Sequence, residues 1–559
     1  MILPQITELV GLCASHGITH VVISPGSRSA AISIAFEQHP DIQVKVVADE
    51  RSAAFIAMGM AQQSQNTVVL VCTSGSASLN YSPAVAEAYY QEIPLLVITA
   101  DRPPEWIDQY DGQTIQQVDI YGKHAKASFT LSVDFEHPDA LWSANRQINQ
   151  ALLSCTSYPQ GPVHINVPIR EPFYPEKGEK YSFSAVRKIE SISSHISLMD
   201  DQWEQLLNSW NESQKRMLVI GQHPRSTVLT RAIERLSAKS NITVVNEITG
   251  NQHGLKNKIS HQDLFLAQDK ILEEPELLIT IGKSLISKNL KRYLRQHQPK
   301  HQWHIRQGDR INDGLQSLTH MLEIEPSSFI ESLTKKIDQS HSQESSDWTE
   351  INSRTAKKSN AFLSNAEFGE LFAIAQCMKS VPSDSLLHLA NSMAIRYANF
   401  IGVHDESIEV FCNRGTSGID GSNGTAVGTA LMTNQTVTLI TGDMAFLYDR
   451  NAFWHEYKLN NLRIIVLNNS GGGIFGMIPG PKKQKSFEKL FQTHQPLTAE
   501  NTARDYGIDY TIAKTKSELE EALQTFFNSS ETAKILEVFT DQKNNEEILK
   551  SYKNYCLGR

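Results

Sequence analysis

TLITGDMAF (residues 438–446) and VLNNSGGGIF (residues 466–475) decide the fold. In each stretch an apolar, β-branched run ends in a turn, with the acid Asp443 after the first run and three consecutive glycines after the second. Continuous apolar runs bounded by turn residues are typical of strands buried on both faces of a parallel sheet. Ligands bind beyond the carboxyl ends of such strands, so we expect the two turns to meet at one edge of a sheet.

The same pattern of short apolar runs separated by helical stretches recurs along the chain. It predicts an α/β protein with three doubly wound parallel-sheet domains, at residues 1–182, 200–335 and 360–559. Polar residues 182–201 are expected to link the first two domains, and the polar tract 332–360 is expected to be a second boundary or an exposed helix. The runs that predict strands are HVVIS, VKVVADE, TVVLVCTSG and IPLLVITADRP in the first domain, RMLVIG, ITVVNE and ELLITIG in the second, and SIEVFCNRG, TVTLITGD, LRIIVLNN and AKILEVFT in the third.

Composition narrows the class of protein. The 559 residues exceed the length that one hydrophobic core serves, and the net charge of -9 gives no overall positive field for nucleic acid or an anionic membrane. The six cysteines are far apart and form no CxxC pair, which argues against zinc clusters and disulfides and favours the cytoplasm. The N-terminus lacks a basic region before a long apolar run, and no segment reaches about 18 uninterrupted apolar residues, so we expect neither export nor stable membrane insertion.

The two deciding stretches together predict a metal site. Ser470 follows Asp443 by 27 positions (470 minus 443) and Gly472 lies two further on, so one short βαβ unit brings both loops to the same sheet edge. The Asp443 carboxylate, the Ser470 hydroxyl and the Gly472 carbonyl are oxygen donors of the kind that Mg²⁺ or Mn²⁺ accepts beside a phosphate. Asn469 is an alternative donor. Either motif alone is as often a plain turn, and only the joint spacing favours the metal site.

A second acidic residue stands at the end of a predicted strand in the first domain. Glu50 lies in VVADERSAAFIAMG (residues 46–59), directly before an apolar helix of small residues. A carboxyl group there is expected to be partly desolvated, which suits acid–base work. An acid at that position also favours the helix dipole, and that is the more frequent explanation for one motif taken alone.

Two other classes of nucleotide-binding protein fit the sequence poorly. LVIGQHPRS contains Gly221 without the later glycines of a dinucleotide fingerprint. Gly282-Lys283-Ser284 resembles the end of a phosphate-binding loop, but the required earlier glycine is Leu277.

The acid and the Gly-rich turn resemble the GD…N motif of thiamine-diphosphate enzymes. In that family a glutamate at the place of Glu50 hydrogen-bonds the aminopyrimidine ring of the cofactor, and the second metal ligand is Asn or Asp. In this chain the matching position is Ser470, whose hydroxyl is a shorter donor than an amide or a carboxylate. The resemblance implies pyrimidine-binding, central and diphosphate-binding domains and the following cofactor contacts: Glu50, Ser74, Gly75, Ile419, Gly442, Asp443, Met444, Asn469, Ser470, Gly472, Gly473 and Ile474.

Further motifs resemble one branch of those enzymes, the 2-succinyl-5-enolpyruvyl-6-hydroxy-3-cyclohexene-1-carboxylate (SEPHCHC) synthases, also called MenD. The resemblance implies a transferase of menaquinone biosynthesis that joins decarboxylated 2-oxoglutarate to isochorismate. The remaining alternative is another thiamine-diphosphate 2-oxoacid decarboxylase or an acetohydroxyacid-synthase-like carboligase. The motifs are SPGSRSAA, DERSAAFIAMGMA, TSGSASLNYSPAVAEAYY, ITADRPPE, NRGTSGIDG and NNSGGGIF.

Both substrates are dianions, and arginine binds carboxylates bidentately without losing its charge. Each arginine alone is more often a surface residue or part of a structural ion pair, so the argument rests on their common location at strand ends. The family's cofactor domains meet across subunits, which implies a homodimer with active sites at the interface, or a homotetramer of two such pairs. The substrate contacts that the resemblance implies are Ser27, Arg28, Arg102, Gln113, Lys288, Ser392, Arg396, Arg414 and Phe475.

Overall fold

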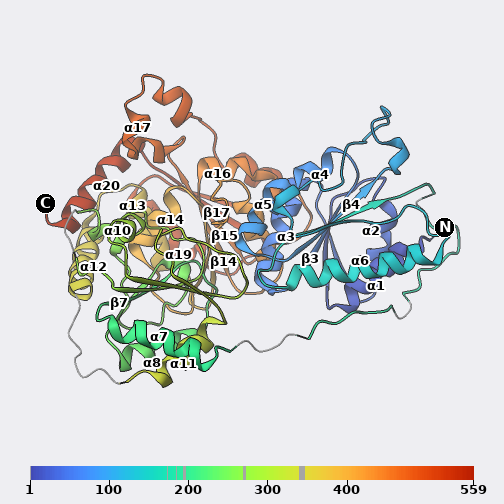
Figure 1. Cartoon of the computed structure of the whole chain (residues 1–559). Coiled ribbons are helices and arrows are strands. Elements are labelled where there is room, and N and C mark those ends of the chain that lie inside the picture. The colour runs from blue at the N-terminus through green and yellow to red at the C-terminus, as the bar shows by residue number, and fades with distance from the viewer. Residues whose placement is uncertain (1, 173, 184–185, 193–196, 269–271, 339–346) are drawn as a thin grey trace.

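The computed structural model describes residues 2–172, 174–183, 186–192, 197–268, 272–338 and 347–559, except the side chain of Pro479. These residues form three parallel sheets, of six, five and six strands, with helices packed on their faces (Figure 1). The predicted fold class is therefore confirmed. None of the described helices is both long and apolar enough to cross a membrane.

The N-terminal sheet has the strand order β2-β1-β3-β4-β6-β5. Every residue of the two central strands β3 and β4 is buried, as their uninterrupted apolar runs predict. The elements of this part are strands β1 (His20–Ile23), β2 (Gln43–Val46), β3 (Val68–Cys72), β4 (Leu95–Asp101), β5 (Ser128–Thr130) and β6 (Val163–Pro168), helices α1 (Pro4–Ser15), α2 (Ala30–Glu37), α3 (Glu50–Ser64), α4 (Ser76–Asn80), α5 (Ser82–Gln91) and α6 (Pro138–Thr156), and the single turns η1 (Pro104–Trp106) and η2 (Gly122–His124).

The middle sheet has the order β11-β10-β9-β7-β8. Its contacts with the C-terminal part include paired hydrogen bonds between the Asn251 side chain and the Val410 backbone, with the Val410 amide 2.7 Å from Oδ1 and the Val410 carbonyl 2.9 Å from Nδ2. The elements are strands β7 (Arg216–Ile220), β8 (Ile242–Asn246), β9 (Leu277–Ile281), β10 (His301–Arg306) and β11 (His320–Glu323), helices α7 (Asp200–Glu212), α8 (Thr227–Lys239), α9 (Gln262–Phe265), α10 (Lys288–Gln296) and α11 (Pro326–Lys336), and the turn η3 (Ile248–Gly250).

The C-terminal sheet has the order β13-β12-β14-β15-β17-β16, so the two strands that carry the deciding stretches, β14 and β15, are direct neighbours. The elements are strands β12 (Leu386–Leu389), β13 (Glu409–Phe411), β14 (Val437–Gly442), β15 (Leu462–Asn468), β16 (Asp509–Ala513) and β17 (Lys534–Phe539), helices α12 (Asp347–Asn365), α13 (Glu370–Ser380), α14 (Met393–Ile401), α15 (Ser422–Ala430), α16 (Asp443–Tyr448), α17 (Pro479–Lys482), α18 (Glu500–Tyr506), α19 (Lys516–Phe526) and α20 (Gln542–Leu557), and the short turns η4 (Arg450–Phe453), η5 (Gly473–Met477) and η6 (Glu488–Gln492).

Both segments expected to separate domains lie partly outside the described residues, namely 184–185 and 193–196 of the first and 339–346 of the second. The described end of the second segment begins the helix α12. This helix buries Trp348 and Leu363, so it is packed along one face rather than exposed throughout.

Helices α3 and α15 hold the N-terminal and C-terminal parts together, and Figure 1 shows α3 and α5 between the two sheets. The contact is made backbone to backbone through glycines. A Cβ atom on Gly428 would lie 2.0 Å from the Ile56 carbonyl oxygen, and one on Gly59 would lie 2.1 Å from the Thr425 carbonyl oxygen. The side chains around this contact form one core that includes Phe55 of α3 and residues of both sheets.

The close crossing predicts that Gly428→Ala destabilises the protein. Alanine normally stabilises a helix interior relative to glycine, but here the added methyl group must push the helices apart, at a cost of about 1–3 kcal/mol. The urea midpoint should therefore fall. Gly314→Ala is the matched control, because a Cβ atom there would meet nothing within 4 Å. An unchanged midpoint for Gly428→Ala would show that the helices are not in backbone contact.

Candidate functional site

The carboxyl ends of four neighbouring strands, β2, β1, β3 and β4, form one edge of the N-terminal sheet. The residues predicted to bind cofactor or substrate in this part follow these strand ends. They are Ser27 and Arg28 after β1, Glu50 after β2, Ser74 and Gly75 after β3, and Arg102 after β4.

The loop that carries Gln113 packs onto this edge. Gly75 has φ +85°, and a Cβ atom there would lie 3.2 Å from the Gln113 Cα, so a side chain would be strained and crowded. The Gly75 amide donates to Gln117 Oε1 at 2.7 Å. Arg102 Nε lies 3.2 Å from Asp111 Oδ2, which ties the same loop to the end of β4. The structure thus brings Gly75, Arg102 and Gln113 together.

Arg28 is buried and held by the end of β6. Its Nη1 donates to the Ile169 carbonyl at 3.0 Å, and its Nη2 lies 3.7 Å from the exposed carboxylate of Glu171. Ser27 beside it is exposed. The guanidinium is therefore positioned by protein contacts at the same edge as Arg102.

Glu50 is the first residue of α3 and is half-buried, as expected from the sequence. Asp49 caps the helix, because its Oδ1 accepts from the Ser52 amide at 3.1 Å. Burial, and after it the Glu50 carboxylate, raises the pKa of the Cys72 thiol on β3, so Glu50 lies close to the end of that strand.

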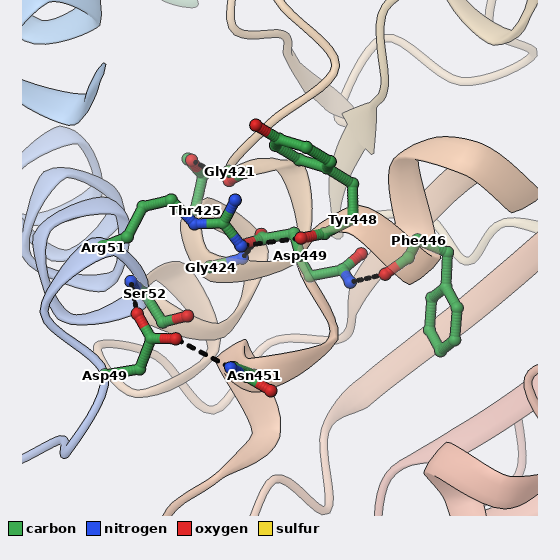
Figure 2. A network of polar contacts seen from close by, with 11 residues as sticks. Asp49, Arg51, Ser52, Gly421, Gly424, Thr425, Phe446, Tyr448, Asp449 and Asn451 are labelled. Atoms are coloured by element: carbon green, nitrogen blue, oxygen red, sulfur yellow. Dashed lines mark hydrogen bonds and ion pairs between the residues drawn. The ribbon is translucent and has the colours of Figure 1, made fainter. Parts of the chain in front are cut away.

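The residues that flank Glu50 are tied to the C-terminal part of the same chain (Figure 2). Asp49 Oδ2 accepts from Asn451 Nδ2 at 2.8 Å. Arg51 Nη2 donates to the Tyr448 carbonyl at 2.6 Å and lies 3.8 Å from Asp449 Oδ1, and its guanidinium stacks over the Tyr448 ring. These contacts fix the start of α3, and with it the backbone of Glu50.

Asp443 begins α16 at the end of β14 and is 3% exposed. Its carboxylate accepts hydrogen bonds from Gln495 Nε2, at 2.8 Å, and from the amides of Met444 and Gly471. The Gly-rich turn therefore lies against Asp443, as the sequence predicts. Burial raises the pKa of Asp443 to about 6 despite these donors. A bound cation would favour the charged form of this carboxylate.

Ser470 and Asn469 occupy different environments in the turn. Ser470 has φ +63°, a left-handed conformation that is uncommon for serine. Asn469 Nδ2 donates to Glu370 Oε1 at 2.6 Å, and Asn469 Oδ1 is buried without a hydrogen-bond partner among the described residues. Burial raises the pKa of Glu370 to about 7. The Asn469 amide nitrogen is thus directed toward Glu370.

The other cofactor contacts predicted in the C-terminal part, and the predicted substrate contact Phe475, lie at the ends of β13, β14 and β15 or in the segments that follow them. Ile474 is partly buried against the C-terminal core, and the Phe475 ring lies 5.9 Å from that of Phe491. Ile419, in the loop before α15, is 38% exposed, which leaves an apolar side chain available for contact. Gly442 and Met444 flank Asp443 directly, and Gly472 and Gly473 follow in the turn.

A cluster of cations lies at the ends of β12 and β13. Arg414 Nη1 donates to Asn391 Oδ1 at 3.0 Å, and Arg396 donates to the Ser392 carbonyl. Ser392 has φ +77°. Burial lowers the pKa of Arg396, and the nearby charge of Arg414 lowers it further. Two of the predicted substrate arginines are therefore neighbours.

The middle part adds positive charge to this cluster. Lys288, the first residue of α10, is exposed. Lys291, one turn further, is partly buried, and its Nζ donates to the Leu285 carbonyl at 3.1 Å. Burial lowers the pKa of Lys291, the Glu247 carboxylate opposes this, and Arg414 and Lys288 act in the same direction as burial. Lys291 thus lies within electrostatic range of both Arg414 and Lys288.

The donor set around Asp443 suits a cation that is shared with phosphate. In the described ranges, no group of three or more His, Cys, Asp or Glu side chains is placed to hold a metal ion. The available donors are one carboxylate, one hydroxyl and backbone carbonyls, all of them oxygen, which fits Mg²⁺ completed by phosphate and water. The residues present therefore fit a metal–diphosphate group.

Three family models match consecutive parts of the chain. The model described as thiamine pyrophosphate enzyme, N-terminal TPP binding domain, matches residues 7–121, and the C-terminal TPP binding domain matches 398–538. The middle domain of thiamine pyrophosphate enzymes matches 190–389, and this range includes β12, a strand of the third sheet. Thiamine pyrophosphate is another name for thiamine diphosphate.

Curated relatives match almost the whole chain. A protein of Cytophaga hutchinsonii named 2-succinyl-5-enolpyruvyl-6-hydroxy-3-cyclohexene-1-carboxylate synthase is 44% identical over 555 residues, 98% of each chain. The chain belongs to the SEPHCHC synthase family. Proteins of the same name from Flavobacterium johnsoniae and from Bacteroides fragilis strain ATCC 25285 are 39% and 36% identical and cover 99% and 98% of each chain.

In this SEPHCHC synthase family member, two residues beside the predicted binding site were not predicted from the sequence. Lys291 is separated from Lys288 by three positions, so a helical reading of residues 288–296 would have placed both on one face. Gln495 lies in a polar loop 52 positions after Asp443, and no local pattern marks it. Only the folded chain brings it to the acid.

Asp449 predicts a pH-dependent contribution to stability. It is fully buried, its Oδ2 accepts from the Gly424 amide at 2.8 Å, and burial raises its pKa to about 7. In the unfolded chain this carboxyl group releases its proton near pH 4, whereas in the folded protein it keeps the proton up to about pH 7. Its contribution to the free energy of unfolding is therefore fully present below about pH 4 and is lost as the pH rises to about 7. Asp449→Asn keeps an acceptor for Gly424 and removes the titration.

We expect Asp449→Asn to gain stability relative to the wild type, by about 2–3 kcal/mol, between pH 5 and pH 8. Urea unfolding at several pH values measures the difference. Asp201→Asn, at an exposed position of α7, is the control and should follow the wild type. If the free energies of unfolding of Asp449→Asn and the wild type changed with pH in the same way, the raised pKa of Asp449 would be contradicted.

Proposed function

We propose that the chain is a transferase of menaquinone biosynthesis that joins 2-oxoglutarate, with loss of CO₂, to isochorismate and forms SEPHCHC. The support is the shared name of relatives that match 98–99% of the chain, together with the cluster of Arg396, Arg414 and Lys291, which lies beyond the ends of β12 and β13. A polyanionic substrate pair requires several cations in one place, and a pyruvate-specific carboligase does not.

The proposed cofactors are thiamine diphosphate and Mg²⁺ or Mn²⁺. When bound, thiamine diphosphate supplies a nucleophilic carbon and an electron sink for the bond that breaks as CO₂ leaves. Asp443, Ser470 and the Gly472 carbonyl are the proposed metal ligands, with Asn469 as the alternative to Ser470. Asn469 would bind a metal through its amide oxygen, and Asn469 Oδ1 has no hydrogen-bond partner among the described residues, so Asn469 stays the alternative ligand.

Glu50 is the proposed catalytic acid–base. Its carboxyl group would hydrogen-bond the aminopyrimidine ring and exchange a proton with it. A half-buried carboxyl group at a helix start, with its backbone fixed by the contacts of Asp49 and Arg51, is suited to proton transfer at a defined position.

The substrate carboxylates are the proposed ligands of the cations. Arg396, Arg414 and Lys288 would bind one dianion from the C-terminal and middle parts, and Arg28 and Arg102 the other from the N-terminal edge. Ser27, Gln113 and Ser392 would add neutral hydrogen bonds, and Phe475 an apolar wall. Guanidinium groups already held by backbone and side-chain contacts lose little freedom on binding.

A homodimer, alone or paired into a homotetramer, is the proposed assembly, with each active site at the subunit interface. Large apolar side chains on the elements that flank Gly75 and Gln113 support it. Leu79 is 50% exposed, Val118 is 60% exposed, and Tyr110 is fully exposed. Exposed apolar residues gathered beside a binding edge are typical of surfaces that a partner covers. The proposed location is the cytoplasm.

The deciding experiment incubates the purified chain with isochorismate, 2-oxoglutarate, thiamine diphosphate and Mg²⁺. Isochorismate consumption should equal CO₂ release, and both should require all components. Pyruvate in place of 2-oxoglutarate is the control, since an acetohydroxyacid-synthase-like enzyme would release CO₂ from it. Turnover of pyruvate without isochorismate consumption would establish that alternative instead.

Glu50→Gln should bind thiamine diphosphate like the wild type and lose turnover by about 10²–10⁴-fold, because the carboxamide cannot transfer the proton. Steady-state rates at saturating cofactor, with calorimetry for binding, measure both effects. Glu37→Gln, at an exposed acid that ends α2, is the matched control and should keep full activity. A fully active Glu50→Gln variant would rule out the proposed role of Glu50 and leave the overall reaction standing.

A further inference from the structure

The chain at the end of η6 and directly after it packs against the Gly-rich turn. We call residues 491–497 the crossing segment. The Gly472 amide donates to the Gln492 carbonyl at 2.7 Å, and the Gln495 amide donates to the Ser470 carbonyl at 3.0 Å. Because two backbone hydrogen bonds join them, the crossing segment has a fixed register relative to the turn.

This register places the Gln495 side chain on Asp443. Gln495 Nε2 donates to Asp443 Oδ2 at 2.8 Å, while Gln495 Oε1 accepts from the Leu497 amide at 2.6 Å. The Leu497 contact fixes the orientation of the carboxamide, since its oxygen already has a donor and its nitrogen must face the carboxylate. Gln495 is therefore held as a hydrogen-bond donor to Asp443.

We propose that Gln495 is a positioning residue for the divalent cation: its carboxamide occupies Asp443 Oδ2 and presents the other carboxylate oxygen as a single metal ligand. The inference rests on the proposed cofactor site at Asp443. Carboxylates that bind metals are oriented by hydrogen bonds from residues that do not touch the metal, and loss of such a bond weakens metal binding.

The composition of the turn explains why this chain needs such a residue. Ser470, the second proposed ligand, has a short hydroxyl side chain and occupies a left-handed conformation with φ +63°. With a short hydroxyl as the second ligand, the cation depends more on the geometry of Asp443. The crossing segment contacts both Asp443 and Ser470, so it fixes the spacing between the two proposed metal ligands.

The test measures Mn²⁺ binding to the full-length chain by electron paramagnetic resonance with saturating thiamine diphosphate. Gln495→Leu removes the donor, and Gln495→Glu replaces the donor with an acceptor that faces Asp443. Both variants should bind Mn²⁺ about 10–100-fold more weakly than the wild type and give an altered bound-Mn²⁺ spectrum. His494→Ala, an exposed neighbour in the crossing segment, is the control and should bind like the wild type.

Thermal unfolding without metal separates this role from a merely structural one: the loss of one hydrogen bond to a buried carboxylate should lower the midpoint of both Gln495 variants by only about 2–4 °C. Unchanged Mn²⁺ affinity in Gln495→Leu would overturn the inference. Equal or tighter binding by Gln495→Glu would overturn it too, because it would make residue 495 a direct ligand. If the wild-type chain binds neither Mn²⁺ nor thiamine diphosphate, both the proposed function and the inference about Gln495 fail. If the wild type binds Mn²⁺ and the Gln495 variants bind it equally well, only the proposed role of Gln495 is ruled out.

Discussion

The buried carboxylate of Asp443 is the constraint on which the rest of the site depends. A carboxylate at 3% exposure is costly to ionise, and the raised pKa of Asp443 reflects that cost. Amide donors from the Gly-rich turn and from the crossing segment offset part of it. The cation proposed for this site, shared with a diphosphate, would offset more of that cost.

A second constraint connects the two cofactor-binding parts of the chain. Helices α3 and α15 approach so closely that Gly59 and Gly428 have no room for a side chain, and Arg51 extends the contact to Tyr448. The start of α3, which carries Glu50, is therefore fixed by the C-terminal part and not only by its own sheet. Movement of either part would displace the proposed acid–base.

The sequence predicted the central features of this arrangement because they are local. Strands such as β3 and β14 are uninterrupted apolar runs, and residues directly after them, including Asp443 and Gly75, follow from the rule that parallel strands bind ligands at their carboxyl ends. Strands with polar interruptions, such as β10 (His301–Arg306), gave no such signal. Contacts made only by folding, such as Gln495 on Asp443 or Asn469 on Glu370, join positions 52 and 99 residues apart, and no local spacing encodes them.

Anomalous X-ray scattering from crystals grown with Mn²⁺ and thiamine diphosphate tests the central claim most directly. The account predicts one strong manganese peak per chain, at about 2.0–2.3 Å from an Asp443 carboxylate oxygen and within coordination distance of the Ser470 hydroxyl and the Gly472 carbonyl. A cofactor bound with its manganese peak away from Asp443, or with the Gly-rich turn withdrawn from the diphosphate, would contradict it.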